Sequence, residues 1–307
     1  MPTPMNESQQ DECHPEAPAW FRWALAQPVE AREIAVAGTV IRYRRWGGAG
    51  KPGLLLVHGN GAHSRWWDFI APWFASTATV AALDLAGMGD SGQRADYTPE
   101  SYGADIRAVA GDMDAAGPID LVAHSFGGLV GVVAVRDRPD LFARVMAIDT
   151  PYDMRRRGSA PPSFDRNPAK TYYPDFAAAR ARFRLLPAQD CRHAFILDHV
   201  ARHSIKRTAD GFCWKFEANP WNFPGFDRGF WNMLRATVPI LPRPMAFLRG
   251  ADSALCTSET EDDWRRLRPE APIVVLPEAR HHVWLDQPLE LVAALRALRA
   301  GWRAPSA

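Results

Sequence analysis

The segment Ala123-His124-Ser125-Phe126-Gly127-Gly128 joins the end of an apolar run to a predicted helix. A serine in so sharp a strand-to-helix turn projects its hydroxyl clear of the backbone, and small residues on both sides relieve crowding. The amides that follow lie at a helix N-terminus, where a developing negative charge is stabilised. We therefore predict that Ser125 is a nucleophile and not merely a helix cap.

A second polar loop, His58-Gly59-Asn60-Gly61-Ala62-His63, follows another apolar run. Ligand sites of parallel sheets form at the carboxyl ends of the strands, so this loop and Ser125 should face one crevice. The backbone N–H groups of Asn60 and Phe126 can then form an oxyanion hole, in which each donor is typically worth roughly 3 kcal/mol in the transition state. His58 is expected to brace the loop.

Alternating strands and helices must position these residues. Short apolar runs predict buried parallel strands, the stretches between them predict helices, and this alternation indicates an α/β fold with right-handed crossovers. The predicted strands are 53–59, 80–85, 119–125, 144–149, 245–249 and 273–276, preceded by a hairpin of 33–37 and 39–46. The predicted helices are 18–27, 99–116, 126–138, 258–267 and 288–302.

The alternation stops between Pro151 and Arg243, where the chain is irregular in pattern and rich in proline and aromatic residues. We predict three parts: residues 1–30 form a tail and a short helix, 31–150 and 243–307 form the core, and 151–242 form an inserted lid. Aromatic residues such as Trp221, Phe223, Phe226 and Phe230 would form the core of the lid and the roof of an apolar pocket. Arg180, Arg182 and Arg184 are expected to be solvated or ion-paired, with a substrate carboxylate as the alternative.

These motifs, together with the turn Asp84-Leu-Ala-Gly-Met-Gly-Asp-Ser91-Gly, resemble the α/β-hydrolase superfamily over residues 34–150 and 243–302. The resemblance implies a mostly parallel eight-stranded sheet flanked by helices, with a helical or irregular lid inserted after strand 6. Asp84 and Ser91 then have structural roles. Ala123 stands where this family usually has glycine, and a serine nucleophile argues against haloalkane dehalogenases and epoxide hydrolases, which need aspartate.

The resemblance also implies a late catalytic histidine, followed four residues on by an acid, often Gln, and Pro. From His281 that register falls on Asp286, Gln287 and Pro288, which identifies His281 as the expected base. His282 is expected to be a packed neighbour.

Two aspartates could be the acid that orients this histidine. Relatives most often carry it after the seventh strand, where Asp252 lies two positions past a glycine, one or two earlier than usual. Other relatives carry it at the end of the sixth strand, where Asp149 lies 24 residues after Ser125. We favour Asp149, with Asp252 as the alternative.

The expected function is hydrolysis of a carboxylic ester of a small or medium apolar molecule. Hydrolysis of a C–C bond and a slow or non-enzymatic ligand receptor are the alternatives on the same scaffold. A net charge of +1 favours neither nucleic acid nor an anionic membrane as a partner. We expect no cofactor, no metal and no membrane span, and a cytoplasmic location, because the first residues lack a secretory-signal pattern.

Overall fold

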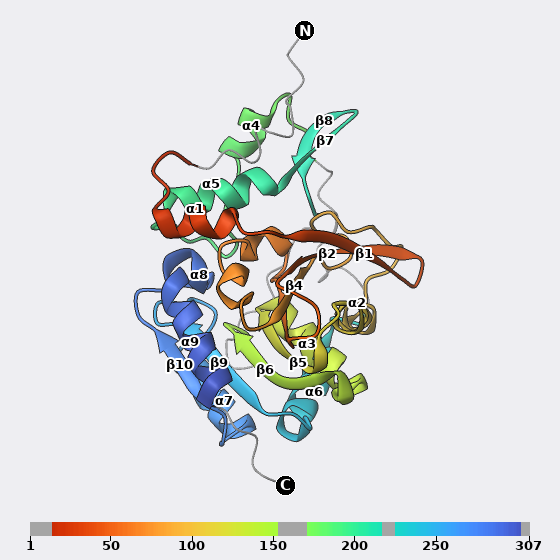
Figure 1. The fold of residues 1–307 in the computed structure, drawn as a ribbon. Coiled ribbons are helices and arrows are strands. Elements are labelled where there is room, and N and C mark those ends of the chain that lie inside the picture. Colours follow the sequence, from red (N-terminus) through yellow and green to blue (C-terminus); the bar gives the residue numbers. More distant parts are fainter. Residues whose placement is uncertain (1–13, 153–170, 217–224, 302–307) are drawn as a thin grey trace.

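The computed structural model describes residues 14–152, 171–216 and 225–301, and its centre is a twisted sheet (Figure 1). The strands of this sheet are β1 Glu30–Val36, β2 Thr39–Trp46, β3 Pro52–Val57, β4 Thr79–Leu83, β5 Ala116–His124, β6 Phe142–Ile148, β9 Met245–Gly250 and β10 Ile273–Leu276. Their order is β1-β2-β4-β3-β5-β6-β9-β10. β2 pairs antiparallel with β1 and β4, and every other neighbouring pair is parallel.

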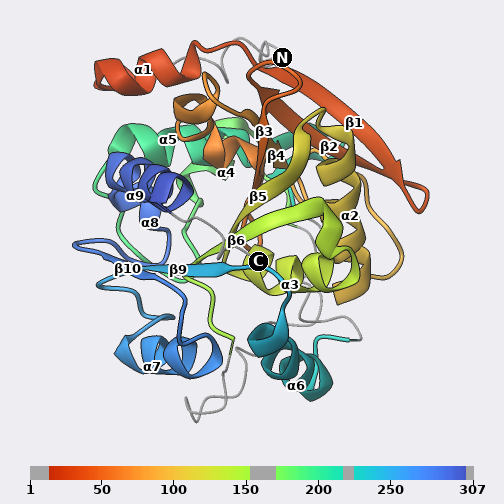
Figure 2. The same ribbon diagram turned by 60° about the horizontal axis from the view of Figure 1, so that its bottom comes forward.

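Helices cover both faces of this sheet (Figures 1 and 2). The α-helices are α1 Ala19–Leu25, α2 Pro99–Asp112, α3 Phe126–Asp137, α4 Phe176–Ala181, α5 Ala194–His203, α6 Arg228–Thr237, α7 Ser258–Leu267, α8 Val283–Asp286 and α9 Pro288–Gly301. Side chains of α2, α3, α6 and α7 belong to one buried cluster, and those of α1, α5, α8 and α9 to a second. The predicted α/β-hydrolase fold is thereby confirmed.

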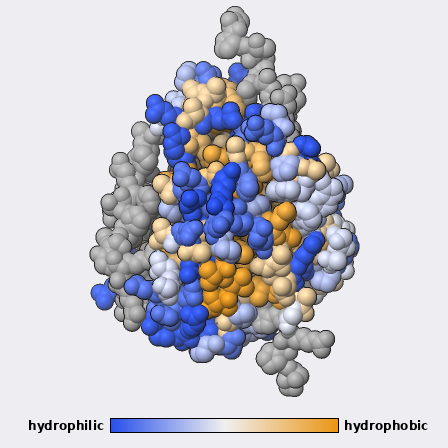
Figure 3. Space-filling model, turned by 90° about the vertical axis from the view of Figure 1, so that its left-hand side faces the viewer, coloured by the Kyte–Doolittle hydropathy of each residue, from blue (hydrophilic) through white to orange (hydrophobic). Residues whose placement is uncertain are grey.

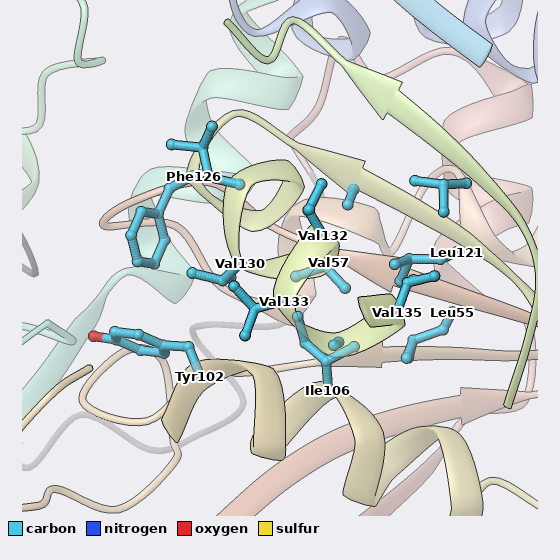
Figure 4. Close-up of a cluster of buried hydrophobic side chains, with 14 of the residues drawn as sticks. Leu55, Val57, Tyr102, Ile106, Leu121, Phe126, Val130, Val132, Val133 and Val135 are labelled. Atoms are coloured by element: carbon cyan, nitrogen blue, oxygen red, sulfur yellow. The ribbon is translucent and has the colours of Figure 1, made fainter. Parts of the chain in front are cut away.

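The central strands contribute to both clusters in alternation. Leu55 and Leu121 point into the first cluster, part of which is shown in Figure 4, whereas Leu54 and Val122 point into the second. Both faces of each strand are therefore buried, which explains why these strands are continuous apolar runs in the sequence.

The predicted elements of the core are confirmed, with one clear error in their bounds. The helix expected over 99–116 ends at Asp112, and β5 already begins at Ala116. Asp114 between them has a positive φ of 58°. Its carboxylate pairs with Arg32 at 2.6 Å and Arg45 at 2.7 Å, so contacts distant in sequence end the helix early.

The segment between β6 and β9 contains helices, whose bounds the sequence pattern did not predict, and a hairpin that it did not predict. The helices are α4, α5 and α6, and the hairpin consists of β7 (Ile205–Thr208) and β8 (Gly211–Trp214). Phe176 and Ile205 form a small cluster of their own, with other side chains of the hairpin region against it. Phe230 and Leu234 of α6 instead join the first core cluster. Residues around α6 thus share their core with the sheet. Trp221 and Phe223 lie outside the described residues.

One face of the molecule, on the side of α8, α9 and β10, carries mostly hydrophilic side chains around a patch of hydrophobic ones (Figure 3). Within the described ranges, none of the helices combines the length and the apolar character needed to cross a bilayer.

Candidate active site

The backbone at Ser125 forms a tight turn between β5 and α3. Ser125 has φ 50° and ψ −119°, its N–H donates to the Ile148 carbonyl at 2.9 Å, and its side chain is partly exposed. Glycines let α3 approach the sheet closely at this point. A Cβ at Gly127 would lie 2.4 Å from the His58 carbonyl oxygen, and one at Gly128 would lie 2.2 Å from Thr150 Oγ1. This is the strained strand-to-helix turn expected from the sequence.

His281 lies in the loop before α8, and its ring meets the carboxylate that ends β6. Its Nδ1 is 2.8 Å from Asp149 Oδ1, and only 3% of His281 and 0% of Asp149 are exposed. A carboxylate can only accept here, so Nδ1 carries the proton and Nε2 keeps the lone pair. The His281 carbonyl accepts a hydrogen bond from His124 Nε2 at 3.0 Å, which ties the histidine loop to the residue before Ser125.

The Asp149 carboxylate is held by two further donors from the loop after β9. Ser253 Oγ donates to Oδ1 at 2.7 Å, and the Gly250 N–H donates to Oδ2 at 3.2 Å. Asp149 itself has a φ of 45°, a positive value that is uncommon for aspartate. Asp252, the other candidate acid, is exposed, and within the described ranges its one hydrogen bond runs from its backbone N–H to the Ala279 carbonyl.

Asp286 fixes the loop that carries the histidine pair. Its Oδ2 accepts the Arg280 N–H at 2.9 Å, which gives a structural reason for the spacing between the histidine and the acid. Burial raises the pKa of this carboxyl. His282 makes its own hydrogen bonds: its Nε2 donates to the Leu186 carbonyl at 3.1 Å and its N–H to Gln189 Oε1 at 2.9 Å.

His58 braces the loop that carries Asn60. The Leu85 N–H donates to His58 Nε2 at 3.0 Å, so His58 Nδ1 is the protonated nitrogen and donates to the Gly59 carbonyl at 2.7 Å. Complete burial lowers the pKa of His58 to about 4 and keeps the ring neutral. Asn60 lies two residues on and is partly exposed, and Phe126 is buried at the start of α3.

Asp84 and Ser91 hold the turn beside this loop. Asp84 accepts the N–H groups of Ser64 at 2.6 Å and Asp90 at 2.8 Å. Burial raises the pKa of this carboxyl. Ser91 Oγ donates to the Asp84 carbonyl at 2.6 Å and accepts the Arg42 N–H at 2.8 Å.

Aromatic side chains pack in the core on both faces of the sheet near these residues. Trp66 and Trp67 are buried, and Trp67 stacks on Trp284 with ring centroids 4.3 Å apart. On the opposite face of the sheet, the Phe226 ring packs against Phe126, the residue after Ser125, at 5.5 Å.

The arginines of the segment around α4 do not form one group. Arg180 pairs with Asp198, whereas Arg182 and Arg184 are exposed. The ion pair of Arg180 agrees with the sequence-based expectation for these residues.

Sequence reasoning missed the residues that support the acid and the histidine. Ser253 and Gly250 come from the loop after β9, and His124 comes from the end of β5. The only signal for Ser253 in the sequence was its place in the loop where Asp252 was considered.

The fold and a match to a family model define the class of protein. The chain belongs to the alpha/beta hydrolase family, whose model matches residues 54–295. It is 27% identical to 2-(acetamidomethylene)succinate hydrolase of Mesorhizobium japonicum over 82% of this chain and 89% of that protein. It is 33% identical to the lipase LipV of Mycobacterium tuberculosis, over 36% of this chain and 41% of the lipase.

A solved structure supports the fold. The thioesterase domain from the curacin biosynthetic pathway superimposes with a TM-score of 0.74 at 20% identity, covering 88% of this chain and 100% of that one.

Proposed function

We propose that this hydrolase cleaves carboxylic esters of small or medium apolar molecules through a covalent acyl-enzyme. Ser125 is the nucleophile, His281 the general base and Asp149 the acid that orients it, with Asp252 taking no part. The observation that carries the proposal is the buried hydrogen bond of 2.8 Å between His281 Nδ1 and Asp149 Oδ1. It fixes the tautomer whose Nε2 can take a proton, which a base for Ser125 requires.

In the proposed reaction, Ser125 Oγ attacks the acyl carbon while His281 Nε2 takes the hydroxyl proton. The backbone N–H groups of Asn60 and Phe126 stabilise the oxyanion of the tetrahedral intermediate. As the intermediate collapses, His281 returns the proton to the leaving alcohol. Water then attacks the acyl-enzyme by the same sequence of proton transfers, which releases the acid and regenerates Ser125.

The apolar character of the proposed substrate is supported by the side chains next to the nucleophile. Phe126 and Phe226 are packed together there, and Trp66 is buried against His282 with ring centroids 5.1 Å apart. An apolar acyl group buried beside such rings would gain roughly 25 cal/mol per Å² of covered surface. The segment between β6 and β9 would form the lid over it.

A second candidate function is hydrolysis of a bond other than an ester bond, such as a C–C bond. It is favoured by the similarity, over most of both chains, to a hydrolase whose named substrate is 2-(acetamidomethylene)succinate. The same serine, histidine and aspartate would serve this reaction.

Covalent labelling tests the proposal and separates it from a ligand receptor. A fluorophosphonate should react with one residue, Ser125, and abolish turnover of p-nitrophenyl esters of graded chain length. Labelling at another residue, or none, would refute the nucleophile. Labelling at Ser125 without turnover of any ester in the panel would refute ester hydrolysis and favour the second candidate or a receptor.

A further inference from the structure

Three imidazole rings are packed together, one of them on the residue that precedes Ser125. His124 ends β5, and His281 and His282 precede α8. Their ring centroids lie 4.6 Å (His124–His281), 5.4 Å (His124–His282) and 4.9 Å (His281–His282) apart. All three residues are buried, and one ring nitrogen of each lies within 4.8 Å of those of the other two.

Hydrogen bonds fix the tautomer of each ring. His124 Nε2 donates to the His281 carbonyl at 3.0 Å, and His282 Nε2 donates to the Leu186 carbonyl at 3.1 Å, because a carbonyl can only accept. Each of these rings therefore keeps a lone pair on Nδ1. His281 donates from Nδ1 to Asp149 and keeps its lone pair on Nε2. A histidine that binds a metal characteristically donates its other N–H to a carbonyl or carboxylate, as all three do here.

Two of these lone pairs are buried without a partner among the described residues. Within the described parts of the chain, His124 Nδ1 and His282 Nδ1 are buried and accept no hydrogen bond. Both rings donate from Nε2, so Nδ1 is the nitrogen that is free to coordinate a metal ion. A glycine lies next to His124 Nδ1, since a Cβ at Gly59 would be 2.7 Å from this nitrogen.

We propose that His124, His281 and His282 bind a divalent transition-metal ion that prefers imidazole, such as Zn²⁺ or Cu²⁺. Three ring nitrogens replace water molecules of the hydrated ion, and no proton leaves the rings because each bonding nitrogen is already unprotonated. With Zn–N bonds of about 2.0–2.1 Å, the three nitrogens would lie roughly 3.4 Å apart around the ion, so binding must draw them closer together. Imidazole ligands without carboxylates favour these ions over Mg²⁺ or Ca²⁺.

The bound ion is an inhibitor and not a cofactor. It occupies the Nε2 lone pair of His281, which can then no longer take the Ser125 proton. This consequence for activity rests on the proposed function, whereas the binding of the ion does not.

The test combines a count of nitrogen ligands with matched variants of the untagged full chain. Cu²⁺ is titrated into the wild type and followed by electron paramagnetic resonance, whose superhyperfine pattern reports the coordinated nitrogens. Zn²⁺ binding is measured by calorimetry for the wild type, His124→Asn, His282→Gln and the control His193→Gln. His193 is partly exposed, outside the three-ring cluster, and packs on Phe195.

We expect one ion per chain with three nitrogen ligands, and a loss of Zn²⁺ affinity of at least about tenfold in His124→Asn and His282→Gln but none in His193→Gln. Fewer than three coordinated nitrogens would overturn the site, as would wild-type affinity in His282→Gln. If His124→Asn does not fold, the number of nitrogen ligands in the wild type and the Zn²⁺ affinity of His282→Gln still test the site. Metal binding in a protein without esterase activity would refute the proposed function alone. Ester turnover that Zn²⁺ leaves unchanged at saturation would refute the inhibition.

Discussion

At the scale of single residues, the account depends on which aspartate orients His281. Asp149 is buried and bonded to the ring, and Asp252 is exposed at the surface. Asp149→Asn should lower kcat by about 10³ to 10⁴, because an amide that donates to Nδ1 imposes the wrong tautomer on the histidine. Asp252→Asn is the matched control and should lower kcat less than about tenfold. Steady-state kinetics on a p-nitrophenyl ester measures both, and the reverse order would contradict the assignment.

Ser253 is predicted to hold Asp149 in position. Its hydroxyl donates to the carboxylate at 2.7 Å and accepts the N–H groups of Leu255 and Cys256. A hydrogen bond to a charged group contributes about 1.5–3 kcal/mol, so Ser253→Ala should lower kcat roughly 10- to 100-fold. KM should change little, since Ser253 acts through Asp149 on the chemical step. Ser258→Ala, an exposed serine at the start of α7, is the control. Unchanged kcat in Ser253→Ala would show that Gly250 alone suffices.

At the scale of elements, the closeness of α3 to the neighbouring loops depends on glycine. Gly128→Ala would put a methyl group 2.2 Å from Thr150 Oγ1, and the resulting overpacking should lower the free energy of unfolding by at least about 2 kcal/mol. Gly111→Ala is the opposite case: the residue is exposed in α2, with nothing within 4 Å of the new Cβ. It should raise the stability by about 0.5–1 kcal/mol. Urea unfolding measures the change in the free energy of unfolding for each variant. Changes of the same sign and size in the two variants would contradict the packing argument.

The elements of the core were predictable because their burial appears in the sequence. Strands such as β3 are buried on both faces and are continuous apolar runs, and α2 begins directly after Thr98, a residue type that caps helices. The bounds of the helices between β6 and β9 could not be predicted, because proline and aromatic residues obscure a helical period there. Ser125 and His281 could be located from motifs. The choice between Asp149 and Asp252 depends on where two loops meet in space, and short-range patterns carry no such information.

At the scale of the whole molecule, neutral histidines are buried throughout the interior. Burial lowers the pKa of five of them: His58, His63, His124, His203 and His282. The unfolded chain, with histidine pKa values near the usual 6.5, binds more protons than the folded one as the pH falls. Their contribution to stability is therefore complete above about pH 6.5 and declines as the pH falls towards the folded pKa values.

Stability should consequently fall between pH 7 and pH 5. For His58 alone, a folded pKa of about 4 corresponds to a loss of about 2 kcal/mol over that interval. Urea unfolding at a series of pH values measures the slope, and His58→Gln should reduce it. A free energy of unfolding that is constant from pH 7 to pH 5 would mean that the pKa values of these rings are the same in the folded and unfolded protein.

The central claim is that Ser125 and His281 act as one catalytic unit, and the most direct test is kcat/KM of Ser125→Ala, His281→Ala and the double variant on one ester. Each single variant should lose about 10⁴-fold or more, and the double variant should lose no more than either, because removing one partner already disables the other. Ser125→Ala should keep a melting temperature close to that of the wild type. Turnover by Ser125→Ala within tenfold of the wild type, or losses that multiply in the double variant, would contradict the account.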